Sequence, residues 1–469
     1  MKNLHCFGLA AAVLLSACGG GGQQKTESEK SSPMFTGAKG EVKLMTLDPG
    51  HFHAALVQKT MYDMVSPEVY VYAPEGPEIK GHLGLTDSYN TRSDNPTSWE
   101  TKLYTGDDYA EKMIAEKPGN VVVLAGNNAK KIDYILSSVE QGLHVLADKP
   151  MVITPEDFPK LEKAFKAAKE NGVMLYDIMT ERYEITTILQ RELSQIEDVF
   201  GSLVEGTPEN PAITKESVHH FAKEVSGKPL IRPVWFYDVA QQGEGIVDVT
   251  THLVDMIQWE AFPEQVLTKD DVEIISARRW TTDLTPAMFK QSTQLDHFPD
   301  FLAKDVEDGK LKVYSNGEIN YRLKGIHSKV SVIWNFEAPA GTGDTHYSIM
   351  RGSKSNLIIQ QGKEENYIPT LYVESVSNDQ SDAFGAQLEK SVKEIIAPAY
   401  PGVSVKKLAG NKWQIEIPQE YRVGHEAHFG QVTEKYLNFL ATGTMPEWEV
   451  PNMIVKYYTT TQGLKSAKE

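Results

Sequence analysis

A lysine that follows a short apolar run is the first candidate for chemistry in this chain. Val145, Leu146 and Ala147 form a run too short for a helix, which favours a buried strand. Pro150 lacks a backbone N–H, so the strand ladder cannot continue past it. Lys149 then lies at the carboxyl end of the strand, where open α/β sheets bind their ligands. A solvated Lys-Pro turn is the alternative interpretation.

A carboxylate and an imidazole recur at helical spacing further along the chain. Asp248 and His252 are four residues apart in a segment, 245–259, with helical periodicity, and Asp255 follows three residues later. A carboxylate beside an imidazole orients the ring and raises its proton affinity, as a general base requires. A helix-start aspartate near a buried core histidine is the structural alternative. No third histidine or glutamate is clearly placed with them, so we expect no bound metal.

The elements around these residues alternate between strands and helices. The pattern predicts strands at 42–47, 69–72, 120–124, 145–147 and 173–178, and helices at 54–62, 109–114, 132–139 and after Thr154-Pro155. Such alternation implies a parallel sheet with helices on both faces. Residues 76–104 contain Gly, Asn, Ser and Thr and predict a loop that can cover a cofactor. After residue 200 the pattern predicts strands at 202–205, 272–277, 311–314, 318–324, 329–336, 346–350, 355–360 and 412–417, several of them alternating, which indicates an open, mostly antiparallel sheet. Helices at 431–440 and 450–465 are expected to return and pack near the first domain.

The first strand leads into a turn that suits a dinucleotide-binding fold, because the next helix can face a pyrophosphate. Only Gly50 stands where the usual fingerprint has three glycines. His51 and His53 occupy the turn and can contact phosphate or substrate, or His51 can simply pack. Glu75 ends the second strand and is either a ribose ligand or a turn residue. The candidate cofactor contacts are Gly50, His51, Phe52, His53, Glu75, Gly126, Asn127, Asn128, Asp148, Lys149 and Pro150.

Two motifs in residues 40–260 resemble those of the glucose–fructose oxidoreductase / inositol dehydrogenase (Gfo/Idh/MocA) family. The family's Glu-Lys-Pro tripeptide is matched by Asp148-Lys149-Pro150. Its Gly-rich turn, with an Asp and then a His four residues later, is matched by residues 243–255. The single Gly50 departs from the family pattern. The resemblance implies a Rossmann-type doubly wound domain over residues 40–200 and an α+β domain over residues 201–469, whose sheet makes oligomer contacts.

The resemblance also implies an activity. NAD or NADP would be held tightly across the carboxyl edge of the parallel sheet, with a sugar between Lys149 and His252. His252 would take a hydroxyl proton while hydride leaves the same carbon, and Lys149 would bond the developing alkoxide. Asp248 would orient His252 or hold a neighbouring hydroxyl. Trp235, Phe236 and Tyr237 could stack on the sugar ring or pack in the core.

Two other classes of function stay open at this point. One is an NAD-dependent glycoside hydrolase, in which transient oxidation at C3 acidifies C2 and permits elimination. The other is a sugar-binding lipoprotein without catalysis. His425 and His428 either start a helix or enter the same cleft, and we expect His219 and His220 to be exposed.

Composition and the N-terminus suggest where the protein works. The chain has 469 residues and a formal net charge of −17, which disfavours nucleic-acid binding. Residues 1–17 resemble a lipoprotein signal peptide, because the apolar run 7–15 ends in Leu-Ser-Ala before Cys18. A plain secretory signal is the alternative. We expect lipidation at Cys18, a flexible linker over 18–39 and a location in the cell envelope.

Overall fold

The computed structural model describes residues 35–225, 228–377 and 381–469, which belong to one compact unit. The predicted signal peptide, Cys18 and most of the predicted linker lie outside the described residues. In the described part, no helix combines the length and the apolar character needed to cross a bilayer. The boundary between the two expected domains at residue 200 stays a prediction.

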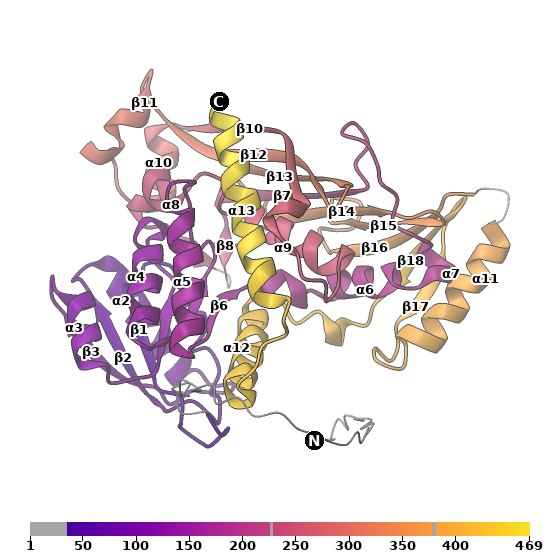
Figure 1. The fold of residues 1–469 in the computed structure, drawn as a ribbon. Coiled ribbons are helices and arrows are strands. Elements are labelled where there is room, and N and C mark those ends of the chain that lie inside the picture. Colours follow the sequence, from indigo (N-terminus) through magenta and orange to yellow (C-terminus); the bar gives the residue numbers. More distant parts are fainter. Residues whose placement is uncertain (1–34, 226–227, 378–380) are drawn as a thin grey trace, which may run out of the picture. The chain divides into compact units, whose positions relative to one another are not determined.

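The first third of the described chain forms a six-stranded parallel sheet in the order β3-β2-β1-β4-β5-β6 (Figure 1). Its strands are β1 (Leu44–Leu47), β2 (Glu68–Ala73), β3 (Glu100–Thr105), β4 (Val121–Leu124), β5 (His144–Asp148) and β6 (Leu175–Ile178). This is the strand order of the Rossmann fold, and the predicted fold class is confirmed. The chain reverses direction across the sheet between β1 and β4, so a ligand crevice is expected outside their carboxyl ends.

The helices beside this sheet are α1 (His53–Leu56), α2 (Pro77–Thr91), α3 (Tyr109–Glu116), α4 (Asn128–Glu140) and α5 (Phe158–Asn171). The helix expected at 54–62 ends at Leu56. Trp99 Nε1 donates to the carbonyl of Gln58 at 2.5 Å, and Arg92 donates to that of Lys59 at 2.7 Å. These side chains donate hydrogen bonds to carbonyl groups that would accept from backbone N–H groups in a longer helix. The helix therefore ends, and the chain turns away.

The expected covering loop at 76–104 is wrong, because α2 and β3 occupy most of it. Pro77 starts α2 at a position where proline is favourable. Ile79, His82 and Thr86 are buried along one side of the helix. The sequence of this segment contains glycines and small polar residues, so it shows no apolar helical pattern that would have predicted the buried side. Only the segment after α2, residues 92–97, reaches the cleft described below.

The second sheet is mixed and has ten strands, with β13 and β7 as its parallel pair. Its path runs β10-β12-β13-β7-β14-β15-β16-β18-β17, and β11 pairs with β12. The strands are β7 (Ile213–Ala222), β10 (Val272–Leu284), β11 (Val306–Glu307), β12 (Lys310–Leu323), β13 (Ile326–Glu337), β14 (Thr345–Arg351), β15 (Ser355–Gln360), β16 (Thr370–Ser375), β17 (Ser404–Lys407) and β18 (Lys412–Glu416). A mostly antiparallel second sheet is therefore confirmed. The strand expected at 202–205 is reduced to a bridge between Leu203 and Gly352, and β7 was not foreseen.

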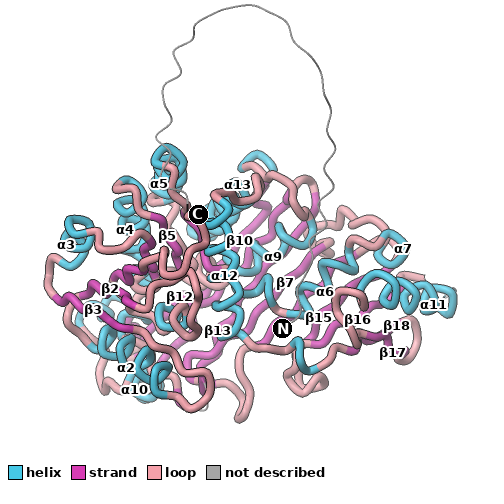
Figure 2. Tube along the Cα trace, turned by 90° about the horizontal axis from the view of Figure 1, so that it is seen from below, coloured by secondary structure: helices cyan, strands magenta, loops and turns pink. Residues whose placement is uncertain are grey.

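Helices α6 (Ile185–Ser194), α9 (Thr250–Ala261) and α13 (Glu449–Lys468) lie against the large sheet (Figure 2). Helix α12 (His425–Thr442) returns to the first sheet, where Phe429, Val432 and Tyr436 join its core. This return of the C-terminal helices was expected and is confirmed. The shorter helices are α7 (Glu197–Phe200), α8 (Val239–Gln242), α10 (Pro286–Thr293) and α11 (Ser381–Ser391), and β8 (Glu224–Val225) pairs with β9 (Lys228–Pro229).

Candidate active site

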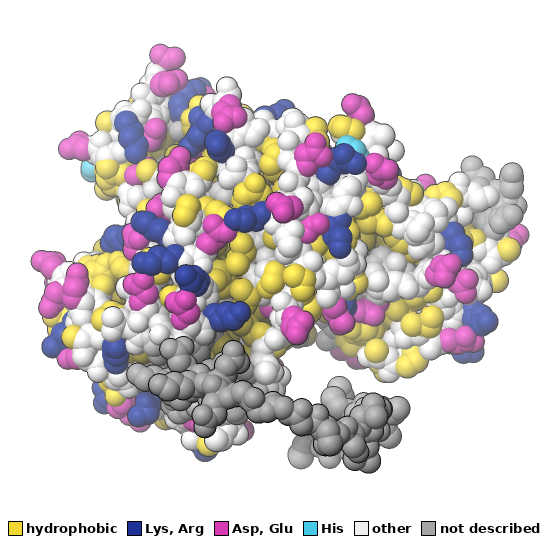
Figure 3. All heavy atoms as spheres, in the orientation of Figure 1, with side chains coloured by type: hydrophobic (Ala, Val, Ile, Leu, Met, Phe, Trp, Pro, Cys, Tyr) yellow, Lys and Arg dark blue, Asp and Glu magenta, His cyan; other side chains and the backbone are white. Residues whose placement is uncertain are grey.

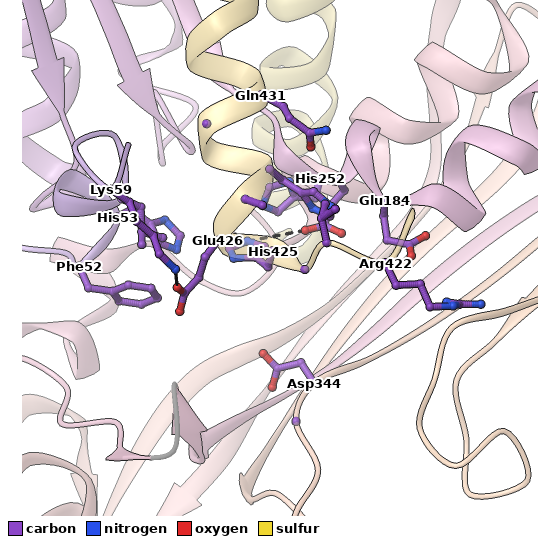
Figure 4. A pocket seen from close by; sticks show the side chains of 18 of the residues that line it. Phe52, His53, Lys59, Glu184, His252, Asp344, Arg422, His425, Glu426 and Gln431 are labelled. Carbon is purple, nitrogen blue, oxygen red and sulfur yellow. Dashed lines mark hydrogen bonds and ion pairs between the residues drawn. The ribbon is translucent and has the colours of Figure 1, made fainter. Parts of the chain in front are cut away.

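A cleft of about 1610 Å³ opens beside the carboxyl ends of the parallel strands. Its walls include the β1–α1 turn, the segment after α2, the 3-10 helix Thr180–Tyr183, β7, α9 and the start of α12. Figure 4 shows His53 and Lys59 on one side of the open space, with Glu184 and Arg422 on the other. Figure 3 shows acidic and basic side chains interspersed over the outer face of the molecule.

Lys149 follows β5 directly and is held in the cleft by an ion pair. Its Nζ donates to Asp248 Oδ1 at 2.6 Å, and Asp248 Oδ2 accepts from Gln242 Nε2 at 2.9 Å. Burial opposes the charge on Lys149, but the carboxylates of Asp248 and Asp148 raise its pKa above the usual value. Lys149 is therefore a fixed cation at neutral pH.

His252 projects from the first turns of α9 into the same cleft. Its Nδ1 is buried and has no hydrogen-bond partner within the described residues. Burial and the charge of Lys149 lower its pKa well below the usual value, so the ring is neutral and can accept a proton. Asp248 was expected to orient this ring or to hold a neighbouring hydroxyl, but its two oxygens bind Lys149 and Gln242 instead.

A buried ion network fixes the helix that carries His252. Arg182 donates to both oxygens of Asp255 at 2.6 and 2.7 Å and also contacts Glu449 at 3.1 Å. Lys456 of α13 bridges Asp255 at 2.8 Å and Asp177 of β6 at 2.7 Å. Asp255 thus bonds to Arg182 and Lys456 in this network and not to the imidazole of His252. Since each of these charges is paired, the network can persist in the interior.

At the cofactor edge, the turns after β1 and β4 touch each other. A Cβ on Gly126 would lie 2.0 Å from the carbonyl oxygen of Asp48, so only glycine fits there. Asp48 has a φ of 48°, a left-handed conformation, where the fingerprint usually begins with glycine. The backbone N–H groups of Gly50 and His51 both donate to Ala125, at 3.2 and 3.0 Å. These two donors are not directed at a phosphate, which is a further departure from the fingerprint.

Only some of the expected cofactor contacts line the cleft, namely His51, Phe52, His53 and Lys149. The others lie outside its lining, namely Gly50, Glu75, Gly126, Asn127, Asn128, Asp148 and Pro150.

The two asparagines instead attach α4 to α8. Asn127 caps α4 and donates to Gln241 at 2.8 Å, and Asn128 donates to the carbonyl of Gln242 at 2.7 Å. Glu75 is exposed after β2.

Two of the three aromatic residues expected to stack on a sugar are placed elsewhere. Tyr237 is 1% exposed, and its hydroxyl lies 2.5 Å from Ser292, so it belongs to the core. Trp235 packs on Gly50, where its ring lies 3.1 Å from the position of a Cβ. Phe236 lines the cleft instead, with Arg232 stacked 4.4 Å from its ring centre.

Several cleft residues were missed or misplaced by the sequence pattern. His219 and His220 were expected to be exposed, but His220 is buried and His219 lines the cleft. His425 and His428 both lie on the first turn of α12 and line the cleft, and burial lowers the pKa of each to about 4. Glu181 was not singled out, although burial raises its pKa.

Comparisons with known proteins agree with this architecture. Residues 82–178 match the family described as "Oxidoreductase family, NAD-binding Rossmann fold", and residues 189–468 match "Putative oxidoreductase C terminal domain". The chain belongs to the Gfo/Idh/MocA oxidoreductase family. Among curated proteins none matches the chain.

Solved structures extend the family comparison over most of the chain. A crystal structure of a putative oxidoreductase from Parabacteroides merdae is 59% identical, covers 93% of this chain and 99% of its own, and has a TM-score of 0.91. A levoglucosan dehydrogenase in complex with NADH and levoglucosan is 12% identical, with 91% and 97% coverage and a TM-score of 0.56. A 3-ketoreductase from Actinomadura kijaniata in complex with NADP is 11% identical, with 89% and 94% coverage and a TM-score of 0.54. The last two share the fold.

A Gfo/Idh/MocA chain binds a nicotinamide cofactor, and the side chains at the inner end of the cleft fit one. Lys149 supplies a charged donor there, and His252 Nδ1 is a buried polar atom without a partner. The pyrophosphate end departs from the fingerprint, as the turn at Asp48 shows.

Three side chains in the described part could geometrically hold a metal ion, which the sequence pattern did not predict. Donor atoms of His51, His53 and Asp148 lie within 4.8 Å of one another. His53 Nδ1 already lies 2.9 Å from Asp148 Oδ2. Burial lowers the pKa of His53, and the charges of Lys149 and Lys131 lower it further. The same positive charges oppose a bound cation, so the group better suits hydrogen bonding to a polar ligand.

Proposed function

We propose that this oxidoreductase oxidises a hydroxyl group of a sugar or glycoside, at C3, to a ketone with NAD or NADP as a retained cofactor. The observation that carries the proposal is the pairing of a charged Lys149 with a neutral His252 in one cleft. A cation and a neutral base are the two groups that alcohol oxidation needs beside a hydride acceptor.

The two side chains have different roles in the proposed reaction. When bound, the nicotinamide supplies the hydride acceptor. His252 takes the hydroxyl proton on a nitrogen of its neutral ring, while Lys149 donates a hydrogen bond to the oxygen on which negative charge develops. Asp248 keeps Lys149 charged and in place through the 2.6 Å contact.

The shape of the cleft supports a glycoside as the substrate class. Pockets for drug-sized ligands are typically about 300–1,000 Å³. A cleft of about 1610 Å³ exceeds this range, as a cleft that holds a cofactor together with a glycoside must, and many polar side chains line it. The similarity to a levoglucosan dehydrogenase and a 3-ketoreductase lends further support.

The experiment that tests the proposal uses purified protein with its bound cofactor. A panel of methyl and aryl glycosides is added, and the absorbance of reduced nicotinamide is followed in a single turnover, with the product identified by mass spectrometry. We expect a glycoside to reduce the cofactor and appear as a ketone two mass units lighter. Failure of every glycoside in the panel, with cofactor present, would contradict the proposal.

We also propose that the protein is lipid-anchored at Cys18 in the cell envelope and self-associates through its large sheet. The support for the anchor is the apolar run that ends in Leu15-Ser16-Ala17-Cys18. The support for self-association is the exposed position of Ile275 on β10 and Ile333 on β13. Light scattering of the protein without residues 1–34 measures the oligomeric state.

A further inference from the structure

Three side chains on one wall of the cleft form a hydrogen-bonded chain that the proposed oxidation does not use. Ser217 and His219 are two residues apart on β7 and point to the same side of the strand. Ser217 Oγ lies 2.5 Å from His219 Nε2, and His219 Nδ1 lies 2.9 Å from Asp344 Oδ2. All three residues line the cleft, and Asp344 precedes β14.

The partners of Asp344 fix the direction of the hydrogen bonds. Asp344 accepts from the backbone N–H of His220 at 3.1 Å and forms an ion pair with Lys223. Burial opposes its charge, but His219 and its other partners hold its pKa far below the usual value. An ionised carboxylate can only accept, so His219 donates from Nδ1. In the neutral ring Nε2 is then the acceptor, which Ser217 occupies.

The ring of His219 is held in place but not sealed off. It stacks on Trp334 with a centroid distance of 5.0 Å and an interplanar angle of 28°. The side chains of His219 and Asp344 are each 21% exposed. A hydroxyl turns about a single bond, so a substrate atom can replace Ser217 at Nε2.

This chain of side chains faces the same space as Lys149. Lys149, Glu181 and His219 all line this cleft, and the charges of His219 and Lys149 oppose the effect of burial, which raises the pKa of Glu181. Figure 4 shows Asp344 across the open space from His425 and His252. One bound sugar can therefore contact both walls.

We propose that Ser217, His219 and Asp344 form a second acid–base site, in which His219 removes a proton from the carbon next to the ketone of an oxidised sugar. The proposal rests on the proposed function, because the ketone is what makes this carbon acidic. The substrate class is accordingly a keto sugar or keto glycoside. Asp344 is a positioning residue that orients His219 and stabilises its protonated form.

The step balances without another reagent. The C–H bond breaks, its electron pair forms a C=C bond, and the carbonyl becomes an enolate oxygen. The proton moves to His219 Nε2, and Lys149 donates a hydrogen bond to the enolate oxygen, as it does in the oxidation. Return of a proton regenerates the ketone with no net oxidation or reduction. In heavy water the returned atom is deuterium.

The test supplies the ketone directly and follows two readouts. The protein is incubated in heavy water with the 3-keto derivatives of methyl α- and β-glucoside, and deuterium at the carbon next to the ketone is measured by NMR. Hydride transfer to the same ketones is measured separately with reduced cofactor. We expect His219→Ala to slow the exchange on the order of hundredfold while hydride transfer continues. Asp344→Asn should slow exchange as well, because His219 loses the carboxylate that orients it.

Matched variants separate this role from a structural one. His219→Gln keeps a polar side chain, and its melting temperature reports the fold. His297→Ala removes a histidine that pairs with Asp296 at 3.0 Å on the exposed surface, and it should leave exchange unchanged. Wild-type exchange no faster than in buffer, or exchange that persists in both His219 variants, overturns the inference. Exchange without hydride transfer would instead contradict the proposed oxidation.

Discussion

Lys149 and His252 differ in charge at neutral pH because their neighbours differ. Lys149 has the carboxylates of Asp248 and Asp148 beside it, which outweigh its burial. His252 has no carboxylate on its ring nitrogen Nδ1 and feels the positive charge of Lys149. The contact with Asp248 helps to keep Lys149 charged, and the charge of Lys149 in turn helps to keep His252 neutral. One residue is ready to stabilise an alkoxide and the other to accept a proton.

We expect Lys149→Ala and His252→Ala each to lose turnover on the order of hundredfold or more, because each removes one of these roles. Single-turnover reduction of the bound cofactor by the best glycoside measures the loss. His297→Ala is the control, since His297 is exposed and lies outside the cleft lining. Wild-type turnover in both site variants would show that the chemistry takes place elsewhere.

Lys131 gives a prediction about pH and stability. It is 2% exposed, donates to Asn128 Oδ1 at 2.6 Å and to the carbonyl of Asp148 at 3.0 Å, and burial lowers its pKa from 10.5 to about 8. Between pH 8 and 10.5 the unfolded chain binds this proton and the folded protein does not. The unfolded state then binds more protons, so this group makes the folded protein more stable as pH rises.

The measurement compares the free energy of unfolding of wild type and Lys131→Met from pH 7.5 to 10.5. The wild type should gain about 3 kcal/mol relative to the variant over this range, since one pKa unit corresponds to about 1.36 kcal/mol. Lys166→Met on α5 is the control, because Lys166 is exposed. A difference that is constant with pH would mean that Lys131 keeps an ordinary pKa.

The local sequence pattern predicted only some of the residues of the candidate site. Lys149 and His252 could be singled out because a proline stop and a helical spacing mark them. Asp344 could not, because its importance comes from β14 lying beside β7, which brings residues 125 positions apart in sequence, His219 and Asp344, into contact. The contact of Asp248 with Lys149 was not predicted, for the same reason. Its spacing placed Asp248 on the same helix face as His252, but its carboxylate accepts a hydrogen bond from Lys149, which follows β5.

At the scale of the elements, α9 is positioned by charges and not only by apolar packing. Arg182, Asp255 and Lys456 are buried and paired, and they join the 3-10 helix after β6 to α9 and α13. Removing one member leaves an opposite charge buried without its partner, which is more costly than losing an exposed ion pair. The network therefore sets the position of His252 relative to the parallel sheet.

We expect Arg182→Ala to reduce the free energy of unfolding by about 3–5 kcal/mol, because Asp255 and Glu449 lose their shared cation. The matched control is Arg278→Ala, whose side chain is 66% exposed in its pair with Glu318 and should contribute about 1 kcal/mol or less. Thermal melting of both variants beside wild type measures the difference. Equal melting temperatures for the two variants would argue against a structural role of the network.

The elements themselves were predictable where one periodicity dominates. The Val-rich strands β4 and β5 and the helix α4 are examples, since each has a short apolar run or a regular apolar face. Helix α2 was missed because its buried face contains His82, Thr86 and Tyr89, which do not give an apolar stripe. Strand β7 was missed because Lys215 is buried by a pair with Glu260, an interaction that no local pattern reveals.

For the whole molecule, the proposed anchor gives a direct prediction. Cys18→Ser removes the only thiol that remains after the predicted cleavage, so the variant cannot receive a lipid there. We expect the variant to appear as uncleaved precursor or in the soluble fraction, while wild type stays with the membranes after a high-salt wash. A Cys6→Ser variant is the control and should behave as wild type. Membrane retention of Cys18→Ser would exclude lipidation at Cys18 as the tether.

The proposed envelope location determines how the protein would have to handle a nicotinamide cofactor. Outside the inner membrane there is no obvious pool of free NAD, so a cofactor that dissociates is not replaced. A protein in the proposed location would therefore have to keep the cofactor through each cycle and restore its redox state in place. Binding at nanomolar Kd corresponds to about −12 kcal/mol, which a large buried ligand can reach.

Most of the range 76–104 is helix α2 and strand β3, so only its segment 92–97 lines the cleft. The start of α12 also lines the cleft, and the ion pair between Lys59 and Glu426 links α12 to the turn after α1. We expect purified protein to contain near-stoichiometric cofactor, which mass spectrometry of the denatured sample detects. Lys59→Ala should speed its loss in equilibrium dialysis, because one link across the cleft is gone, whereas Lys166→Ala should not. A wild-type cofactor that exchanges within seconds and must be added for every turnover would contradict retention.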